Sequence, residues 1–249
     1  MKPLVILVPI YRPTLLPLEH YSLTQSLVAL AKREVRFIGP EQLDLSYYHE
    51  HFPGIPFTGF AAASFDSVQG YSRLLLSQSF YQLFADYEFL LILQTDAIVL
   101  RDELDHWCAQ VFDYVGAPWP NGYELFVNMG KFGGANGKQV KVPVGNGGLS
   151  LRRIHKCIAL LAEFDGIVST FDRTGSSEDL FFSVMGALSE NFVMPNEITA
   201  SLFSVELKPS YYFAVNGGRL PMGTHAWWTY EPEFWLQHLP GKPPLQTPQ

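Results

Sequence analysis

The sequence predicts one α/β domain built on a parallel sheet, and three segments near the N-terminus support this prediction. Residues 4–8 are a continuous run of leucine and β-branched side chains that stops at Pro9, as expected for a strand buried on both faces. Residues 15–32 carry apolar side chains at helical spacing, and residues 35–38 form a second short apolar run. A strand, a helix and a strand in this order predict a right-handed βαβ unit with parallel strands.

The rest of the sequence continues to alternate apolar strands with helices. Residues 89–93 are fully apolar and predict a central strand, and apolar side chains resume at residues 97–100. Residues 41–66 show no clear period, so we expect a loop-rich connection there. The further elements that spacing predicts are helices at residues 71–84, 103–110, 153–163 and 178–185, and a strand at residues 114–116.

Two segments are predicted to lack regular structure. Residues 118–145 are rich in glycine and contain three lysines, and a structureless segment of this length is usually a functional lid or a linker. Residues 241–249 are rich in proline and are predicted to form a disordered tail. Because the composition does not change along the chain and no repeat is present, we expect residues 1–240 to form a single domain.

The composition is that of a globular protein with a modest negative charge. Hydrophobic residues make up 47% of the chain and charged residues 16%, which excludes the intrinsically disordered class. The formal net charge of −7 argues against nucleic acid as a partner. A diphosphate could still bind, because a metal ion or a few local dipoles can hold it without a net positive charge.

Cysteine usage and the lack of long apolar runs favour a cytoplasmic location. Cys108 and Cys157 are the only cysteines and form no disulfide framework, which is typical of a reducing compartment. Residues 4–8 are too short for the core of a signal peptide, and no run of about 18 apolar residues is present. We therefore expect a cytoplasmic protein, and peripheral association with a membrane is left open.

Several common catalytic motifs are missing from the sequence. Pro9 and the residues after it stand where dinucleotide-binding proteins have a glycine-rich loop, and the same absence disfavours a sugar nucleotidyltransferase. No Gly-x-Ser-x-Gly motif supports a serine hydrolase. The spacing of His49 and His51 does not place them on one face of a helix, which argues against a metal site there.

The polar segment Gln94-Thr95-Asp96 directly follows the predicted central strand and interrupts its apolar pattern. Polar side chains at the end of a buried strand need a reason, because burying them unpaired costs free energy. Ligands gather at the carboxyl ends of strands in open α/β sheets, and oxygen ligands suit Mg²⁺ or Mn²⁺. Asp96 is therefore either a metal ligand or a capping residue, and its position alone does not decide between them.

Four short segments carry a resemblance to a known family. They are Tyr71-Ser72-Arg73-Leu74 with residues 87–97, Asn146-Gly147-Gly148-Leu149-Ser150, Ser177-Glu178-Asp179 and Gly223-Thr224-His225. In this order they resemble glycosyltransferases of the GT-A type, and more closely the DUF5672 family of bacterial proteins. The resemblance spans roughly residues 3–235 and implies a Rossmann-like, mixed but mainly parallel sheet flanked by helices.

The resemblance also implies a reaction and a set of site residues. A sugar would pass from a nucleotide-diphosphate donor, most simply a UDP-sugar, to a hydroxyl group of a glycan or glycolipid. Asp179 is similar to the base of inverting members, with Glu178 beside it, and Asp96 and His225 are similar to metal ligands. Together with position along the fold, this predicts donor contacts from Pro9, Tyr11, Arg12, Arg73, Gln94, Thr95, Asp96, Gly147 and Gly148, and acceptor stacking on Trp119 and Trp227. We also expect residues 118–145 to close over the acceptor.

One position departs from the pattern of GT-A enzymes. Gln94 stands where the usual Asp-x-Asp motif has its first carboxylate, and an amide adds hydrogen bonds but no charge. With only Asp96 and His225, an Mn²⁺ or Mg²⁺ ion would depend on the donor diphosphate and water for its other ligands. Two alternatives therefore stay open: a transferase that needs no metal, and a catalytically inactive protein that binds nucleotide sugars or glycans.

Overall fold

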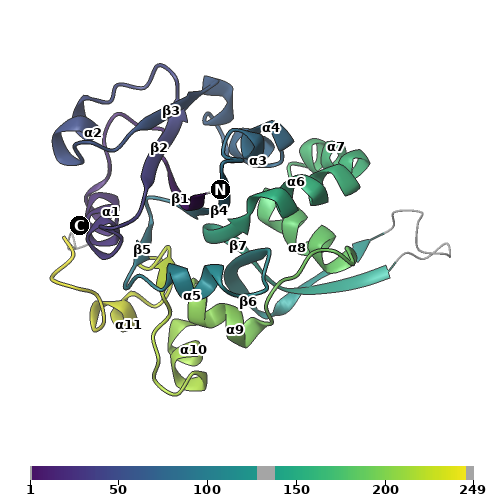
Figure 1. Ribbon diagram of the computed structural model, residues 1–249. Coiled ribbons are helices and arrows are strands. Elements are labelled where there is room, and N and C mark those ends of the chain that lie inside the picture. The colour runs from purple at the N-terminus through teal and green to yellow at the C-terminus, as the bar shows by residue number, and fades with distance from the viewer. Residues whose placement is uncertain (1, 128–137, 245–249) are drawn as a thin grey trace.

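A six-stranded mixed sheet forms the centre of the molecule (Figure 1). The computed structural model describes residues 2–127 and 138–244, and within them the strand order of this sheet is β3-β2-β1-β4-β7-β6. The strands β1 to β4 run parallel, whereas β7 is antiparallel to both of its neighbours, which confirms the predicted mixed, mainly parallel sheet. The strands are β1 (Lys2–Pro9), β2 (Val35–Pro40), β3 (Phe57–Phe60), β4 (Tyr87–Leu93), β6 (Tyr114–Val127) and β7 (Lys138–Arg153).

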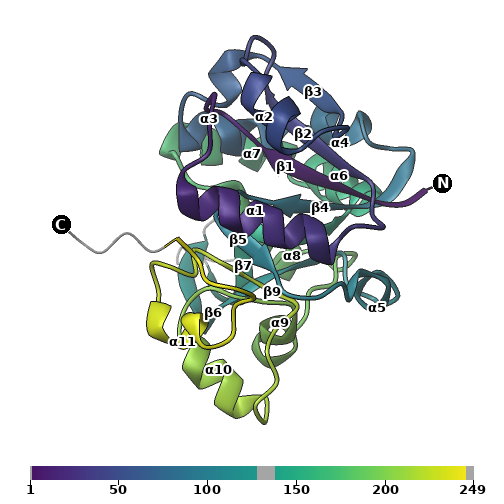
Figure 2. The ribbon, with the colours of Figure 1, turned by 90° about the vertical axis from the view of Figure 1, so that its left-hand side faces the viewer.

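The predicted unit of two parallel strands and a connecting helix is present as β1, α1 and β2. The helix α1 begins at Pro17, whose fixed φ suits the first helical position, and Figure 2 shows it lying across the sheet. Alternate residues of β1 point to opposite faces and enter two different cores: Ile6 and Val8 pack on the side of α1, and Val5 and Leu7 pack on the other side. A strand buried on both faces needs the continuous apolar run that the sequence contains.

The helices form a layer on each face of the sheet. One layer contributes α3, α4, α6 and α8 to the core that contains Val5 and Leu7, and the other contributes α1, α2, α5 and α9 to the core that contains Ile6 and Val8. The α-helices are α1 (Pro17–Ala29), α2 (Ser46–His51), α3 (Val68–Leu75), α4 (Gln78–Gln82), α5 (Leu104–Cys108), α6 (Ile154–Glu163), α7 (Asp165–Thr174), α8 (Glu178–Leu188), α9 (Glu197–Phe203), α10 (Pro209–Val215) and α11 (Pro232–Leu236).

A second, three-stranded sheet joins the middle of the chain to its C-terminal part. Its strands are β5 (Ala97–Val99), β9 (Gly223–His225) and β8 (Ser204–Val205), with β9 in the centre. β5 is antiparallel to β9, and β8 is parallel to it. The start of β5 and the ends of β8 and β9 therefore lie at the same edge of this small sheet, directly after the carboxyl end of β4.

Two predictions of local structure in the first hundred residues are wrong. The segment 71–84 is not one helix, because Ser77 takes an extended backbone and separates α3 from α4; serine competes with helical hydrogen bonds through its side chain. Residues 41–66 are not only loop, since they contain α2, the strand β3 and a 3₁₀ turn (Ala62–Ser64). All four residues of β3 are half-buried at the sheet edge, so no alternation of apolar and polar residues marks the strand.

The loop predicted for residues 118–145 is largely a pair of strands. β6 and β7 pair from Tyr123 with Val142 to Val127 with Lys138, and this arm extends away from the body of the protein (Figure 1). Val140 and Val142 are buried and give the arm one apolar face, a pattern that the many glycines of the segment hide in the sequence. Residues 128–137, with the tip of the expected lid, lie outside the described residues.

Other predictions concern the ends of the chain and its cysteines. Residues 241–244 contain no helix or strand, and residues 245–249 of the expected tail lie outside the described part. Cys108 and Cys157 are free thiols, as predicted. None of the described helices combines the length and the hydropathy needed to cross a bilayer.

A charged side chain lies at the centre of one core. Arg152 has no exposed surface, and its guanidinium contacts Glu178 Oε1 at 3.2 Å and donates hydrogen bonds to Tyr81 and Ser150 at 3.0 and 3.1 Å. The guanidinium also lies 5.2 Å from the centre of the Tyr114 ring. A buried charge is tolerated only when it is paired and hydrogen-bonded, and these contacts meet that condition.

Replacing Arg152 by leucine is expected to lower the free energy of unfolding by about 3–5 kcal/mol, because Glu178 would stay buried without its cation. Urea denaturation at neutral pH measures the change, and adding Glu178→Leu should regain most of the loss. Arg73→Leu is the matched control. Its side chain is 58% exposed in its pair with Asp172, so the expected loss is below about 1 kcal/mol. Equal losses in the two single variants would contradict the prediction.

Candidate functional site

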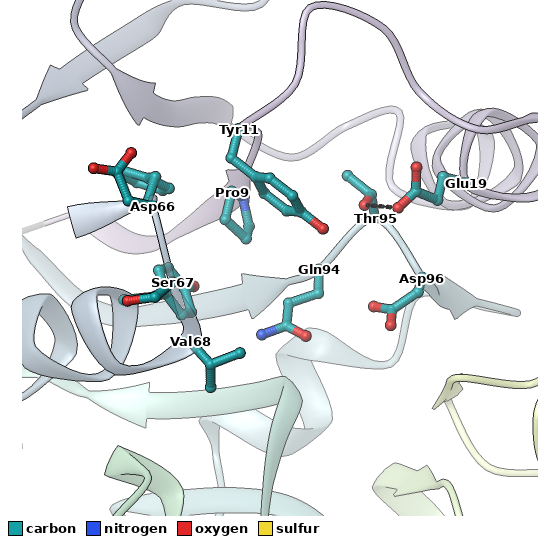
Figure 3. Close-up of a pocket in the computed structure, with 11 residues that line it drawn as sticks. Pro9, Tyr11, Glu19, Asp66, Ser67, Val68, Gln94, Thr95 and Asp96 are labelled. Atoms are coloured by element: carbon teal, nitrogen blue, oxygen red, sulfur yellow. Dashed lines mark hydrogen bonds between the residues drawn. The ribbon is translucent and has the colours of Figure 1, made fainter. Parts of the chain in front are cut away.

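A cavity of about 490 Å³ opens at the carboxyl ends of β1 and β4 (Figure 3). This is where open α/β sheets bind their ligands. The lining comes from the end of β1, from α1, from the segment that leads into α3, and from the turn after β4. The lining residues are Pro9, Tyr11, Glu19, Phe65, Asp66, Ser67, Val68, Tyr71, Gln94, Thr95 and Asp96. Five of the predicted donor-binding residues are among them: Pro9, Tyr11, Gln94, Thr95 and Asp96.

The turn after β4 presents alternate side chains to the cavity. Figure 3 shows Gln94 and Asp96 pointing into it, while Thr95 turns toward α1 and donates a hydrogen bond to Glu19 at 3.1 Å. The backbone N–H of Gln94 donates to the carbonyl oxygen of Gly148 at 2.9 Å, which joins the turn to β7. Asp96 is thus held at the cavity edge by a short turn that is anchored on both sides.

Glu19 organises the wall of the cavity and was not predicted from the sequence. Its side chain is buried, accepts a hydrogen bond from the backbone N–H of Leu16 at 2.8 Å, and forms an ion pair with Arg12. A glutamate three residues into a helix is a recognisable capping residue, and this signal could have marked Glu19. Because Arg12 is engaged by Glu19, its side chain does not line the cavity, although we predicted it to contact the donor.

Asp96 and His225, the two predicted metal ligands, lie side by side. His225 Nε2 is 3.1 Å from Asp96 Oδ1, and its other ring nitrogen is 3.6 Å from Glu206 Oε2. The second sheet creates this arrangement, because Ala97 pairs with His225 in the ladder of β5 and β9. The result is a row of carboxylate, imidazole and carboxylate across the edge of the small sheet.

Gly148 makes room for the ring of His225. A Cβ atom at this position would lie 2.3 Å from His225 Nε2, which is far inside van der Waals contact. Gly148 was predicted to contact the donor, and the group that packs closely against it in the structure is the imidazole of His225. Any side chain at position 148 would push the ring away from its place beside Asp96.

The pair of Asp96 and His225 fits a divalent metal ion. Both ring nitrogens of His225 are buried, and neither forms a hydrogen bond with the described residues, which is rare for buried polar atoms. A separation of 3.1 Å is close to the roughly 3 Å between neighbouring ligands of an octahedral Mg²⁺ site. No group of three or more metal-binding side chains occurs in the described chain, so further ligands would have to come from the substrate and water.

The electrostatic state of His225 reflects its two carboxylate neighbours. Burial lowers the pKa of the imidazole, but Asp96 and Glu206 more than offset this and raise the pKa of His225 to about 10. A metal ion bound at Nε2 would take the place of a proton there.

A second pair of carboxylates lies at the start of α8. Glu178 is buried, and it is held by Arg152 at one oxygen and by the hydroxyl of Ser72 at the other, at 3.0 Å. A Cβ atom at Gly147 would lie 3.3 Å from the Cβ of Asp179, so this glycine faces the start of the helix. Both oxygens of Glu178 are therefore engaged by protein groups, whereas the half-buried side chain of Asp179 lies next to Gly147.

Asp179 has the properties of a weak base. Ser177 and the backbone N–H of Leu180 both donate hydrogen bonds to its Oδ1, which leaves Oδ2 without a hydrogen bond in the described structure. Burial and the nearby Glu178 carboxylate raise the pKa of Asp179 to about 6, although the hydrogen bonds oppose this. At neutral pH the side chain is mostly ionised, yet it is more basic than an ordinary aspartate.

Two further predicted site residues lie elsewhere. Arg73 pairs with Asp172 at 2.7 Å on the surface and does not line the cavity. Trp227 was predicted to stack on an acceptor, but it is fully buried and donates to Ser22 at 2.9 Å, so that prediction is wrong. Tryptophan side chains are buried in protein cores more often than they stack on sugars, and this preference also holds for a tryptophan next to a site motif.

Trp119 keeps a position compatible with its predicted role. Its side chain is half-buried and covers Gly145, where an added Cβ would lie 2.5 Å from the indole. The Tyr123 ring lies 5.6 Å from it, between ring centres, and is 49% exposed. The neighbouring backbone of Val144 accepts a hydrogen bond from Ser183, one turn along α8 from Asp179.

Several residues of the site were missed by sequence reasoning. Phe65, Asp66, Ser67 and Val68 line the cavity just before and at the start of α3, and the N-cap role of Ser67 is the one local signal among them. Glu206 has no local signal, because only the pairing of β8 with β9 brings it to His225.

Comparison with known proteins identifies the family. Residues 54–225, more than half of the chain, match the family described as "Protein of unknown function (DUF5672)". The chain belongs to the DUF5672 family. Among proteins of curated function, none matches the sequence of this DUF5672 protein.

The fold of this DUF5672 protein is similar to solved glycosyltransferase structures. The galactosyltransferase LgtC in complex with donor and acceptor sugar analogues is 16% identical, with 89% of this chain and 86% of that chain covered and a TM-score of 0.54. An active-site mutant of LgtC is 16% identical, with 96% of this chain and 88% of that chain covered and a TM-score of 0.53. The apo form of mouse xyloside xylosyltransferase 1 is 11% identical, with 90% of this chain and 97% of that chain covered and a TM-score of 0.51. At such identities the likeness shows the fold, which is the predicted GT-A fold.

The variant Gly148→Ala of this DUF5672 protein is expected to fold with its His225 ring displaced from Asp96. The overpacking should lower the free energy of unfolding by about 1–3 kcal/mol. Urea denaturation measures the loss, and a crystal structure shows the ring. Gly166→Ala in α7 is the control: an added Cβ meets nothing within 4 Å, so stability should be unchanged or up to about 1 kcal/mol higher. An unmoved His225 ring would refute the prediction.

The raised pKa of Asp179 predicts a pH-dependent stability. Because the folded protein holds this proton up to about pH 6 and the unfolded chain releases it near pH 4, the contribution of Asp179 falls as pH rises between these values. Asp179→Asn should therefore gain up to about 3 kcal/mol relative to the natural protein between pH 4 and pH 7. Urea denaturation across this range tests it. The exposed Asp165→Asn serves as control and should show no such gain.

Proposed function

We propose that this protein is a glycosyltransferase that moves a sugar from a UDP-sugar to a hydroxyl group of a glycan or glycolipid. The observation that carries the proposal is the arrangement of Asp96, His225 and Asp179 around two adjacent glycines. Asp96 borders the cavity, His225 covers Gly148, and Asp179 faces Gly147. Sugar transfer needs a cationic group for the charged leaving group and a basic group for the reacting hydroxyl, both held on a rigid frame.

The cavity suits the nucleotide part of the donor. Its volume lies within the usual range for small-molecule sites, and Tyr11 and Phe65 provide aromatic surface for a base. The hydroxyl of Tyr71 is buried and has no hydrogen-bond partner in the described chain, so it is free to bond to a donor group. Gln94 points into the same space and offers a neutral amide (Figure 3).

A divalent cation, Mn²⁺ or Mg²⁺, bound by Asp96 and His225 would neutralise the charge that develops on the departing diphosphate. The cavity itself supports this need. Its described lining includes the carboxylates of Glu19, Asp66 and Asp96 but no lysine or arginine, so the protein offers the diphosphate no cation of its own there. Because Asp96 is the single carboxylate beside Nε2 of His225, the donor diphosphate would have to supply further ligands to the ion.

Asp179 takes the proton of the acceptor hydroxyl. Oδ2 is the oxygen available for this step, because Oδ1 is held by Ser177 and Leu180. The oxygen of the acceptor forms a bond to the anomeric carbon as the bond to the diphosphate breaks, and attack from the opposite face inverts the anomeric centre. Trp119 and Tyr123, on the β6 and β7 arm, form the aromatic surface on which an acceptor sugar would stack.

Replacing Asp179 by asparagine is expected to lower the turnover of UDP-sugar by about 10²- to 10⁴-fold, because it removes the base. Release of UDP is measured with a panel of UDP-sugars, Mn²⁺ and candidate glycan acceptors. Calorimetric titration with UDP and Mn²⁺ should give the same Kd for the variant and the natural protein within about twofold, because Asp179 does not line the nucleotide cavity. Asp165→Asn is the charge-matched control and should keep full turnover.

Each other outcome of this experiment has a defined meaning. Full turnover by Asp179→Asn, or a product with retained anomeric configuration, would reject Asp179 as the base of an inverting reaction. Tight binding of UDP-sugars without any turnover would favour the catalytically inactive binding protein. Equal turnover with and without a chelator would reject the metal-assisted mechanism.

A further inference from the structure

Glu206 occupies a defined place behind the metal-binding pair. The ladder between β8 and β9 pairs Ser204 with Gly223 and Val205 with Thr224, so the next residue of each strand, Glu206 and His225, are neighbours at the sheet edge. Asp96 lies on the opposite side of His225 because β5 pairs with the other edge of β9. The carboxylate of Glu206 faces Nδ1 at 3.6 Å, and the carboxylate of Asp96 faces Nε2 at 3.1 Å.

Glu206 has no other polar role in the described structure. Its side chain is only 12% exposed, it forms no hydrogen bond, and its one ionic contact is with His225. A carboxylate that is nearly buried without a hydrogen bond is unfavourable unless a nearby group compensates for it. Nδ1 of His225 is also buried and also lacks a hydrogen-bond partner in the described structure. Each of the two groups can therefore compensate for the burial of the other.

We propose that Glu206 is a positioning residue that holds a proton on Nδ1 of His225 and so keeps Nε2 free to bind the metal ion. The inference rests on the proposed function, because it assigns a role within the metal site of that function. A metal-binding histidine commonly donates its second ring N–H to a carboxylate, which sets the tautomer and the ring orientation. The ring is held from the third side by the close contact with Gly148.

The geometry separates this role from direct metal binding. Glu206 and Asp96 face different nitrogens of one imidazole, so Asp96 and Nε2 would hold the ion while Glu206 would act on the ring through Nδ1. A distance of 3.6 Å to Nδ1 exceeds a hydrogen bond by about half an ångström, which a small shift of the Glu206 side chain would close. The site thus consists of one metal-binding carboxylate and one supporting carboxylate, placed by opposite neighbours of β9.

The test compares Mn²⁺ binding by three forms of the full chain in the presence of UDP, measured by electron paramagnetic resonance of free Mn²⁺. Glu206→Met keeps the volume but has no acceptor for Nδ1–H, and it should raise the Kd of Mn²⁺ about 10- to 100-fold. Glu206→Gln keeps a neutral acceptor oxygen and should raise the Kd by a smaller factor, about three- to tenfold. Glu190→Met, at an exposed turn after α8, is the control and should not change the Kd.

A second readout does not depend on affinity. With UDP and Mg²⁺, two-bond ¹H–¹⁵N spectra should show the proton of His225 on Nδ1 in the natural protein and a loss of this single tautomer in Glu206→Met. If Glu206→Met does not fold, Glu206→Gln alone decides. A Kd equal to that of the natural protein in either folded variant overturns the inference and leaves the proposed transfer reaction intact. Failure of the natural protein to bind Mn²⁺ with UDP overturns both the inference and the metal-assisted mechanism.

Discussion

The buried charge of Arg152 is the constraint on which the rest of the structure depends. A guanidinium with no exposed surface is stable only where carboxylate, hydroxyl and aromatic partners surround it, and here they come from β6, β7, α4 and α8. The antiparallel end of the sheet is thereby tied to the helical layer beside it. Glu178, the first residue of α8, pairs with this charge. The next residue, Asp179, is therefore held at a fixed position beside Gly147.

The candidate site lies where two sheets of different kinds meet. The large parallel sheet ends its buried strands at the cavity and supplies the turn with Asp96, while the small sheet supplies His225 and Glu206. Without the other sheet, the polar residues of each sheet would lack the neighbours that they have in the site. The combination of the two sheets places the cavity beside Asp96 and the side chain of Asp179 next to Gly147.

The parts of this architecture that could be predicted are those encoded by local patterns. Continuous apolar runs locate β1 and β4, and the end of β4 locates Asp96. Gly148 and His225 could be found because the order of short motifs resembles a family. Glu206 could not be found, since it becomes a neighbour of His225 only through the pairing of two strands that are far apart in sequence. The prediction for Trp227 failed because burial depends on packing from α1 and the C-terminal segment, which no local pattern records.

The division of the site between the two sheets has a consequence for the biosynthesis of the protein. A ribosome releases the N-terminal part of the chain first, so β1 to β4 can associate while β8 and β9 are still unsynthesised. Until then the hydrogen-bonding groups of β5 lack their partners on β9, and Asp96 stands without its imidazole neighbour. The nascent chain can therefore assemble the walls of the cavity early, whereas the pairing of Asp96 with His225 must wait until β9 has been synthesised.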